Sequence, residues 1–401
     1  MDLQPPPNGG SKAWMQVFMC WIVIFISWGY VNAYGTFQAY YITTLPQSQS
    51  TISWIGSIQV FLCYFTGAFS GRLLDAGYFP HTLVAGSLLQ LLGIFLTSVA
   101  TQYWQLLLTQ GILTGLGGGV LLTPAVTVVL TYFSTRRAIA LGIVTTGNSL
   151  GGMIYPIITR ELLPTLGFAW TMRLIGFIHL ACFGVVIAFM RSRLPPRQTG
   201  PLIDWTAFRE SVFVSYVAGL FCFQWATYYT IYYIGSFGIQ VLGMPYTEAA
   251  YLVTIINGAG VPARFIIPML ADKYGPLNLL VPTGYGLSVI AFCWLAASDR
   301  VGLYAWTAFY GLLSGGFQSL MPTGVASITK RLDHLGTRLG MCFMVMSFAA
   351  TGPPIGGAIQ SAEGGGYRAA QIWAALSTVM CAVLLTLARI RKTGWALEEK
   401  C

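Results

Sequence analysis

Charged residues are scarce in this sequence. Asp, Glu, Lys and Arg make up 8% of its 401 residues, whereas hydrophobic residues make up 55%. Soluble domains carry about 25% charged residues. Because a soluble globule of this length keeps most of its residues near water, it could not hide so much apolar surface. The composition therefore excludes a soluble fold and predicts a protein that crosses a membrane many times.

Paired cysteines and metal-binding motifs are absent as well. The eight cysteines stand singly, mostly within apolar runs, and no two of them form a Cys-x-x-Cys pair. This pattern predicts neither a disulfide framework nor a zinc site. The sequence also lacks a His-Glu-x-x-His motif, clustered Cys and His, and paired carboxylates within apolar runs, which catalysis inside a membrane would need. We therefore expect neither an enzyme nor a bound metal or cofactor.

In place of charge, the sequence has apolar runs long enough to cross a bilayer, which takes about twenty residues. The runs lie at 14–37, 53–70, 81–100, 103–131, 138–159, 170–190, 210–235, 248–270, 277–298, 302–328, 337–359 and 368–388. They predict an all-α membrane protein with twelve transmembrane helices. The first run is longer than the core of a signal peptide, so we expect no cleavable targeting segment.

The positions of the basic residues agree with this count of spans. If both termini face the cytoplasm, 16 of the 21 Lys and Arg fall in cytoplasmic segments, 4 fall outside, and Arg264 alone lies within a span. This asymmetry follows the positive-inside rule and predicts cytoplasmic termini, with the plasma membrane as the expected location. It also explains the net charge of +9 by topology and attraction to lipid headgroups, and not by binding to nucleic acid.

The two halves of the sequence resemble each other. Residues 111–142 and 311–340 both combine a glycine-rich start, a proline within the span, a basic loop and a closing Leu-Gly. Parallel repeats of this kind predict two pseudo-symmetric six-helix bundles, although glycine-rich helices also resemble one another by chance. The expected divisions are a cytoplasmic tail, a first bundle, a cytoplasmic linker, a second bundle and a second tail, at 1–13, 14–190, 191–209, 210–388 and 389–401.

Two short motifs after the second and eighth spans resemble the cytoplasmic loop motif of the major facilitator superfamily. They are GRLLDAG (71–77) and MLADKYG (269–275). The resemblance implies a gate that holds the halves closed toward the cytosol. Asp75 and Asp272 would be its acidic members, with Arg72 and Lys273 as their basic partners.

Three further stretches resemble the fungal branch of the monocarboxylate porter family. They are NGGSKAW (8–14), SWGYVNAYGTFQAYY (27–41) and YFSTRRAIALGIVTTG (132–147). The resemblance implies the major facilitator fold and a transporter that works as a monomer on a small-molecule substrate in a lipid bilayer.

The charged residues of the animal members of that family are only partly kept. In those members a lysine in span 1, and an aspartate one turn before an arginine in span 8, bind the proton and the carboxylate together. Arg264 matches that arginine, whereas Gly260 and Asn32 occupy the aspartate and lysine positions. Lactate and proton symport is therefore not implied, and the proton remains a candidate coupling ion.

Arg264 also points to a binding site by its own chemistry. An arginine at the centre of a span costs about 2.5–3.5 kcal/mol on insertion scales, so it needs a wet cavity or a partner. None of the 12 acidic residues falls in the middle of a span. An anionic substrate would supply the missing charge through bidentate hydrogen bonds. The alternative is that the side chain snorkels to the cytosolic surface or bonds backbone carbonyls.

Polar residues on other spans are candidates to line the same cavity. Asn257 lies seven residues before Arg264 on the same helical face. The other candidates are Asn32, Asn148, Gln224, Tyr228 and Gln318. A hydrogen bond between helices is the alternative role for each of them.

Two further features each have two interpretations. His179 is either a proton relay or a neutral structural donor. The aromatic run WATYYTIYYIGSF (225–237) predicts either a belt at the membrane interface or the wall of a cavity for a bulky substrate.

The pattern as a whole predicts a secondary transporter that moves a small organic metabolite by alternating access. The best candidate cargo is an organic anion that resembles a monocarboxylate, and the missing lysine and aspartate favour something larger than lactate. The alternatives are an efflux carrier for a larger secondary metabolite and an importer of a vitamin-like heterocycle. A membrane sensor without transport activity is a more distant possibility, as is a membrane enzyme.

Overall fold

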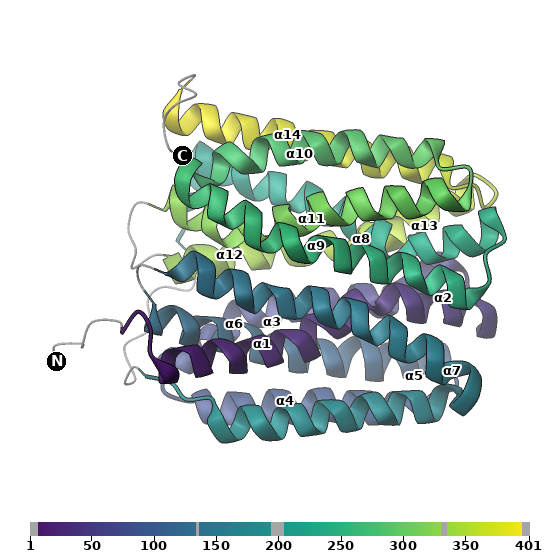
Figure 1. Cartoon of the computed structure of the whole chain (residues 1–401), viewed down its shortest axis with the longest axis horizontal. Helices are drawn as coiled ribbons and strands as arrows, with labels where there is room; N and C mark the ends of the chain where they lie inside the picture. The colour runs from purple at the N-terminus through teal and green to yellow at the C-terminus, as the bar shows by residue number, and fades with distance from the viewer. Residues whose placement is uncertain (1–6, 134–135, 194–203, 330–334, 395–401) are drawn as a thin grey trace.

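The structure is a computed structural model that describes residues 7–133, 136–193, 204–329 and 335–394. Within these ranges every regular element is a helix, as the composition predicts. The helices run side by side along the longest axis of the molecule (Figure 1). α1 begins and α14 ends at the same end of the molecule, on the left of Figure 1, which we call the terminal end.

The first half of the chain contains seven α-helices and one π-helical segment among the described residues. They are α1 (Ser11–Asn32), α2 (Tyr34–Thr44), α3 (Gln49–Asp75), α4 (Phe79–Thr97), α5 (Tyr103–Leu106), η1 (Leu107–Leu113), α6 (Thr114–Tyr132) and α7 (Arg137–Phe189). α7 breaks at Gly167, whose φ of 73° is in the region that favours glycine. The break divides α7 into two arms.

The second half has the same character. Its described elements are η2 (Ala207–Arg209), α8 (Ser211–Leu242), α9 (Tyr246–Tyr274), α10 (Pro276–Cys293), η3 (Trp294–Ala296), α11 (Arg300–Ile328), α12 (Leu335–Ser347), η5 (Phe348–Thr351), α13 (Gly352–Ala362) and α14 (Arg368–Thr393). Most helices begin and end close to the ends of the apolar runs, whereas α2 and α8 continue to Thr44 and Leu242, beyond the predicted ends at 37 and 235. α1 begins at Ser11, inside the expected tail, and α14 continues to Thr393, beyond the expected end of the bundle.

Nine helical segments among the described residues are long and apolar enough to cross a membrane. One of them, Ile139–Phe189, contains the break at Gly167 and covers two of the predicted spans. α8 and α11 match two more predicted spans but fall outside the nine, and both are rich in tyrosine, serine and glycine. The count of twelve spans therefore stays a prediction.

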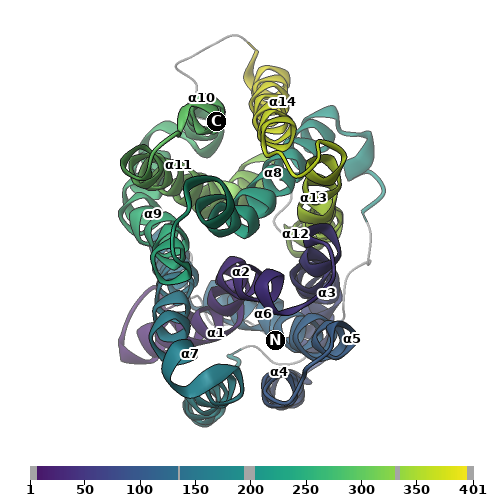
Figure 2. The ribbon, with the colours of Figure 1, turned by 90° about the vertical axis from the view of Figure 1, so that its right-hand side faces the viewer.

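The helices before and after residue 204 occupy different sides of the molecule. Figure 2 shows α1–α7 in its lower part and α8–α14 in its upper part. The two sets meet where α7 packs along α9, where α3 packs along α12 and α13, and where α2 packs on α8. The predicted linker and tails lie partly outside the described residues, at 194–203, 1–6 and 395–401.

Candidate functional site

Arg264 lies in α9 at the contact between the two sets of helices, with only 3% of its surface exposed. Its Nε donates a hydrogen bond of 2.7 Å to Ser149 Oγ on α7. Its Nη2 donates one of 3.0 Å to Gln318 Oε1 on α11. The side chain therefore does not snorkel to the surface, and it joins both halves of the molecule.

Both partners of the Arg264 guanidinium are neutral. Among the described residues, no carboxylate forms an ion pair with it. A buried charge without a counter-charge is costly, and two neutral hydrogen bonds offset only part of that cost. The site is therefore electrostatically suited to an anion.

Three asparagines extend this polar site across α1, α7 and α9. Asn32 Nδ2 donates to Asn148 Oδ1 at 2.7 Å and lies 3.5 Å from Asn257 Oδ1. Asn257 Nδ2 in turn donates to the carbonyl of Gly152 at 3.2 Å. The structure thus brings together Asn32, Asn148 and Asn257, three of the candidate cavity residues. In this conformation they bond to one another.

The space beside Arg264 is small. A cavity of about 10 Å³ lies there, which is room for a single water at most. Its walls are Asn32, Ser149, Ile231, Ile256, Asn257, Gly260, Arg264, Gly311, Ser314, Gly315 and Gln318. The site is therefore closed, and no organic substrate fits beside Arg264 until the helices separate.

Gly260 occupies the position where the resemblance to the animal monocarboxylate porters implies an aspartate, and the packing explains why this chain has a glycine. A Cβ at Gly260 would lie 3.1 Å from the carbonyl oxygen of Gly311 and 3.3 Å from the Cα of Gly315. Small residues let two helix backbones approach this closely. An aspartate would require α9 and α11 to move apart.

Gln224 and Tyr228 form a second polar cluster, which does not line the cavity beside Arg264. Gln224 Nε2 donates to the Tyr64 hydroxyl at 2.8 Å, and the Tyr228 and Tyr64 hydroxyls lie 3.5 Å apart. The Tyr64 ring packs on Trp28 with a centroid distance of 4.6 Å. This cluster also joins the two halves, because Tyr64 belongs to α3 and Gln224 to α8.

Sequence reasoning missed Ser149 and Tyr64. Ser149 follows Asn148 directly, so its place beside a predicted site residue was a usable signal. Tyr64 is one aromatic residue among several in span 2, and no local pattern distinguishes it.

The aromatic run of α8 does not form a belt at the membrane interface. Tyr228, Tyr229, Tyr232 and Tyr233 are all buried, with at most 4% of each exposed. A belt would require these rings at the surface near the helix ends. Tyr232 instead contacts Tyr34 of α2, with ring centroids 4.7 Å apart, so this part of the run faces the other half.

His179 is buried between the arms of α7. Its Nε2 lies 2.7 Å from the Tyr155 hydroxyl, and both side chains are fully buried. A paired, buried histidine of this kind suits a structural role within the first half of the molecule.

The predicted gate residues lie at the ends of α3 and α9. Arg72 and Asp75 are in the last turn of α3, and Asp272 and Lys273 are in the last turn of α9. Lys273 Nζ lies 5.0 Å from the ring centroid of Tyr274. The side chain of Asp75 is outside the described part of the chain, so an ion-pair gate stays a prediction.

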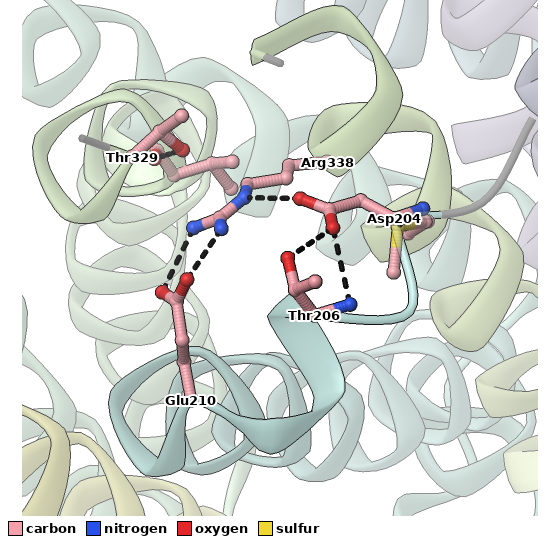
Figure 3. Close-up of polar contacts among 7 residues, drawn as sticks. Asp204, Thr206, Glu210, Thr329 and Arg338 are labelled. Atoms are coloured by element: carbon pink, nitrogen blue, oxygen red, sulfur yellow. Dashed lines mark hydrogen bonds and ion pairs between the residues drawn. The ribbon is translucent and has the colours of Figure 1, made fainter. Parts of the chain in front are cut away.

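An ion cluster at the terminal end was not predicted from the sequence. Arg338 of α12 donates through Nη1 and Nη2 to both oxygens of Glu210, at 3.0 and 2.6 Å, and through Nε to Asp204 at 3.2 Å (Figure 3). The second oxygen of Asp204 accepts from the Thr206 backbone at 3.1 Å and from its hydroxyl. The cluster fastens the segment before α8 to the beginning of α12.

The fold and this central polar site can be compared with known proteins. The sequence pattern of the Major Facilitator Superfamily (MFS) matches residues 19–306, well over half of the chain. The chain belongs to the Major Facilitator Superfamily. As an MFS protein it is an integral, multi-pass membrane transporter for a small molecule, and not an enzyme.

Individual relatives of this MFS transporter are fungal. It is 43% identical over 392 residues to an MFS-type transporter of Gibberella zeae. The aligned region covers 97% of this chain and 89% of that relative. It is 40% identical over 361 residues to the MFS-type transporter dbaD of Emericella nidulans, and the aligned region covers 88% of this chain and 80% of that relative. It is 35% identical over 387 residues to the aspyridones efflux protein apdF of the same fungus, and the aligned region covers 96% of this chain and 79% of that relative.

Proposed function

We propose that this MFS transporter exports an organic anion of the secondary-metabolite type, by alternating access of two six-helix bundles with twelve spans in all. The observation that carries the proposal is the buried guanidinium of Arg264, which has only neutral partners at the contact between the halves. We further propose that the protein lies in the plasma membrane with both termini in the cytoplasm. Its general pattern is that of the monocarboxylate porter family.

An anionic group would bind Arg264 in place of the present hydrogen bonds. Carboxylates, enolates and phenolates accept charge-assisted hydrogen bonds, which are roughly twice as strong as neutral ones. Ser149 and Gln318 would then orient the guanidinium or bond the same ligand. The asparagines at 32, 148 and 257 would offer donors and acceptors to the rest of the molecule.

The neighbouring aromatic side chains favour a cargo with a planar, conjugated part. Tyr64 and Tyr228 meet across the halves, and Trp28 packs on Tyr64. The Trp28 Nε1 and the Tyr232 hydroxyl are buried without a hydrogen-bond partner. Aromatic walls stack on conjugated rings, and unpaired donors favour a ligand with carbonyl or hydroxyl groups. A short aliphatic acid would use neither feature.

Direction of transport is proposed from the relatives. One of them is named an efflux protein for aspyridones. Profiling metabolites inside cells and in the medium of a deletion strain tests this direction. Accumulation inside the cells supports export, whereas depletion inside them would indicate the uptake of a compound such as a heterocyclic vitamin.

The decisive experiment replaces Arg264. Because the charged hydrogen bonds to the cargo contribute about 1.5–3 kcal/mol, Arg264→Leu should lower the initial rate of export at low substrate about 10- to 150-fold. Arg264→Lys keeps the positive charge but loses the planar guanidinium that can form two parallel hydrogen bonds, so export should fall less than in Arg264→Leu. The measurement is the appearance in the medium of the compound that the deletion strain accumulates.

Protein abundance in the membrane is measured in parallel. Arg209→Leu is the matched control, because Arg209 is an exposed arginine that does not line the cavity. Normal export by Arg264→Leu at normal abundance would contradict the anion site.

A further inference from the structure

A groove separate from the Arg264 site lies at the terminal end of the first half. The end of α3 and the beginning of α4 form one wall, and the end of the second arm of α7 forms the other. Its volume is about 480 Å³, within the range of about 300–1,000 Å³ that is typical of small-molecule sites. The proposed transport cycle assigns no role to this groove.

The walls of the groove are mainly apolar. They include Leu74, Leu83, Val84, Ile187 and Met190. From Val84 an exposed apolar stripe continues along α4 through Leu88 and Leu92, which are 61% and 51% exposed. In a membrane protein such a stripe faces lipid, so the groove opens onto the acyl-chain region of the bilayer.

Arg191 lies at the polar end of the groove. Its guanidinium donates to the carbonyls of Ile187, Ala188 and Met190 at 2.7–2.9 Å, and these bonds hold it at the end of α7. Among the described residues it forms no ion pair, and its side chain is exposed. It therefore presents an uncompensated positive charge beside an apolar channel.

We propose that this groove is a binding site for one anionic phospholipid, with an acyl chain against Leu83 and Val84 and the headgroup phosphate against Arg191. The groove and the charge suit the two parts of that ligand. An apolar channel favours an acyl chain, and an arginine near the membrane surface favours an anionic headgroup. The lipid would brace the turn between α3 and α4 against the end of α7.

The test uses the purified full-length protein in detergent, with phosphatidylglycerol and phosphatidylcholine of the same acyl chains as probes. Native mass spectrometry measures how much of each lipid stays bound. One arginine near the surface contributes about 1 kcal/mol to the binding of anionic lipid, so Arg191→Gln should weaken phosphatidylglycerol binding about five-fold and leave phosphatidylcholine unchanged. Val84→Trp, which fills the groove, should weaken the binding of both lipids.

Two matched variants and a soluble probe complete the design. Arg209→Gln removes another exposed arginine that does not line the groove, and Leu88→Trp adds the same bulk one turn away on α4. Both should bind lipid as the wild type does. Glycerophosphate without acyl chains should not compete.

Three results would overturn the proposal. The first is equal retention of the two lipids by the wild type. The second is unchanged phosphatidylglycerol binding in Arg191→Gln and Val84→Trp. The third is full competition by glycerophosphate, which would point to a phosphate site and not a lipid site. None of these measurements depends on the identity of the cargo.

Discussion

At Gly260 the backbones of α9 and α11 lie in direct contact, and this contact decides the chemistry that the site can perform. The resemblance to the animal monocarboxylate porters implies an aspartate at this position, one turn before Arg264. In this protein the position is filled by the close approach of Gly311 and Gly315. Arg264 therefore has Ser149 and Gln318 as partners and not a neighbouring carboxylate.

We predict that even the smallest side chain at residue 260 is costly. Gly260→Ala places a Cβ 3.1 Å from the Gly311 carbonyl, and overpacking of this kind costs typically about 1–3 kcal/mol. Gly260→Asp should cost more and lower the amount of folded protein. The midpoint of thermal unfolding in detergent measures both effects.

Gly184→Ala is the control for this prediction, because a Cβ at Gly184 meets nothing within 4 Å. Alanine has a higher helix propensity than glycine, so that variant should be neutral or slightly more stable. If Gly260→Ala unfolds at the wild-type temperature, the contact between α9 and α11 is looser than the structure shows.

At the scale of elements, the segment before α8 is held to α12 by Arg338. The side chains of Arg338 and Asp204 are 6% and 4% exposed, and that of Glu210 is 36% exposed (Figure 3). α12 in turn packs on α3 of the other half. The cluster thus connects the end of the polypeptide link between the halves to a helix at their contact.

We predict that Arg338→Leu destabilises the protein by about 3 kcal/mol, because it removes the guanidinium that pairs with the buried Asp204 carboxylate and with Glu210. Arg338→Lys should be intermediate, since lysine keeps the charge but cannot form the two parallel bonds to Glu210. Thermal unfolding of the purified variants measures these differences. Arg338→Leu combined with Asp204→Asn should recover part of the loss, and an equally unstable double variant would contradict the assigned pairing.

At the scale of the whole molecule, the transport cycle that we propose requires the two halves to separate on one side at a time. The cavity beside Arg264 is only about 10 Å³, so the closed arrangement must open for a substrate to bind. α3 and α12 lie against each other across the halves, where a Cβ at Gly340 would be 3.9 Å from the Cα of Ala68. A bond between these two positions would prevent the helices from separating there.

We predict that oxidation of the double variant Ala68→Cys with Gly340→Cys stops transport and that a reductant restores it. The Cβ position at residue 340 lies 3.9 Å from the Cα of Ala68, and the Cα atoms of cysteines joined by a disulfide usually lie about 4.4–6.8 Å apart. Export by intact cells is the measurement, before and after treatment. Each single variant under the same oxidant is the control, and transport that continues in the cross-linked protein would contradict separation of α3 from α12.

Several features were predictable because they depend only on the local sequence. Helix positions follow from the length and apolarity of each run. These two properties do not depend on how the helices are arranged. The tyrosines of α8 were not predictable in this way. The run at 225–237 was compatible both with burial of these side chains and with their exposure at the membrane interface. The structure decides for burial, since α2, α9, α13 and α14 pack around α8.

The sequence by itself determined that this chain is helical, membrane-spanning and built like a transporter, and that Arg264 needs an explanation. Apolarity, helix period and the scarcity of acidic residues suffice for these conclusions. Only the tertiary structure decided that Ser149 and Gln318 hold Arg264, that Gly260 leaves no room for a carboxylate, and that Arg338 fastens Asp204 and Glu210. These contacts join residues 54–134 positions apart in the chain. They depend on how each helix is rotated and how far it is shifted against its neighbours, which no local pattern specifies.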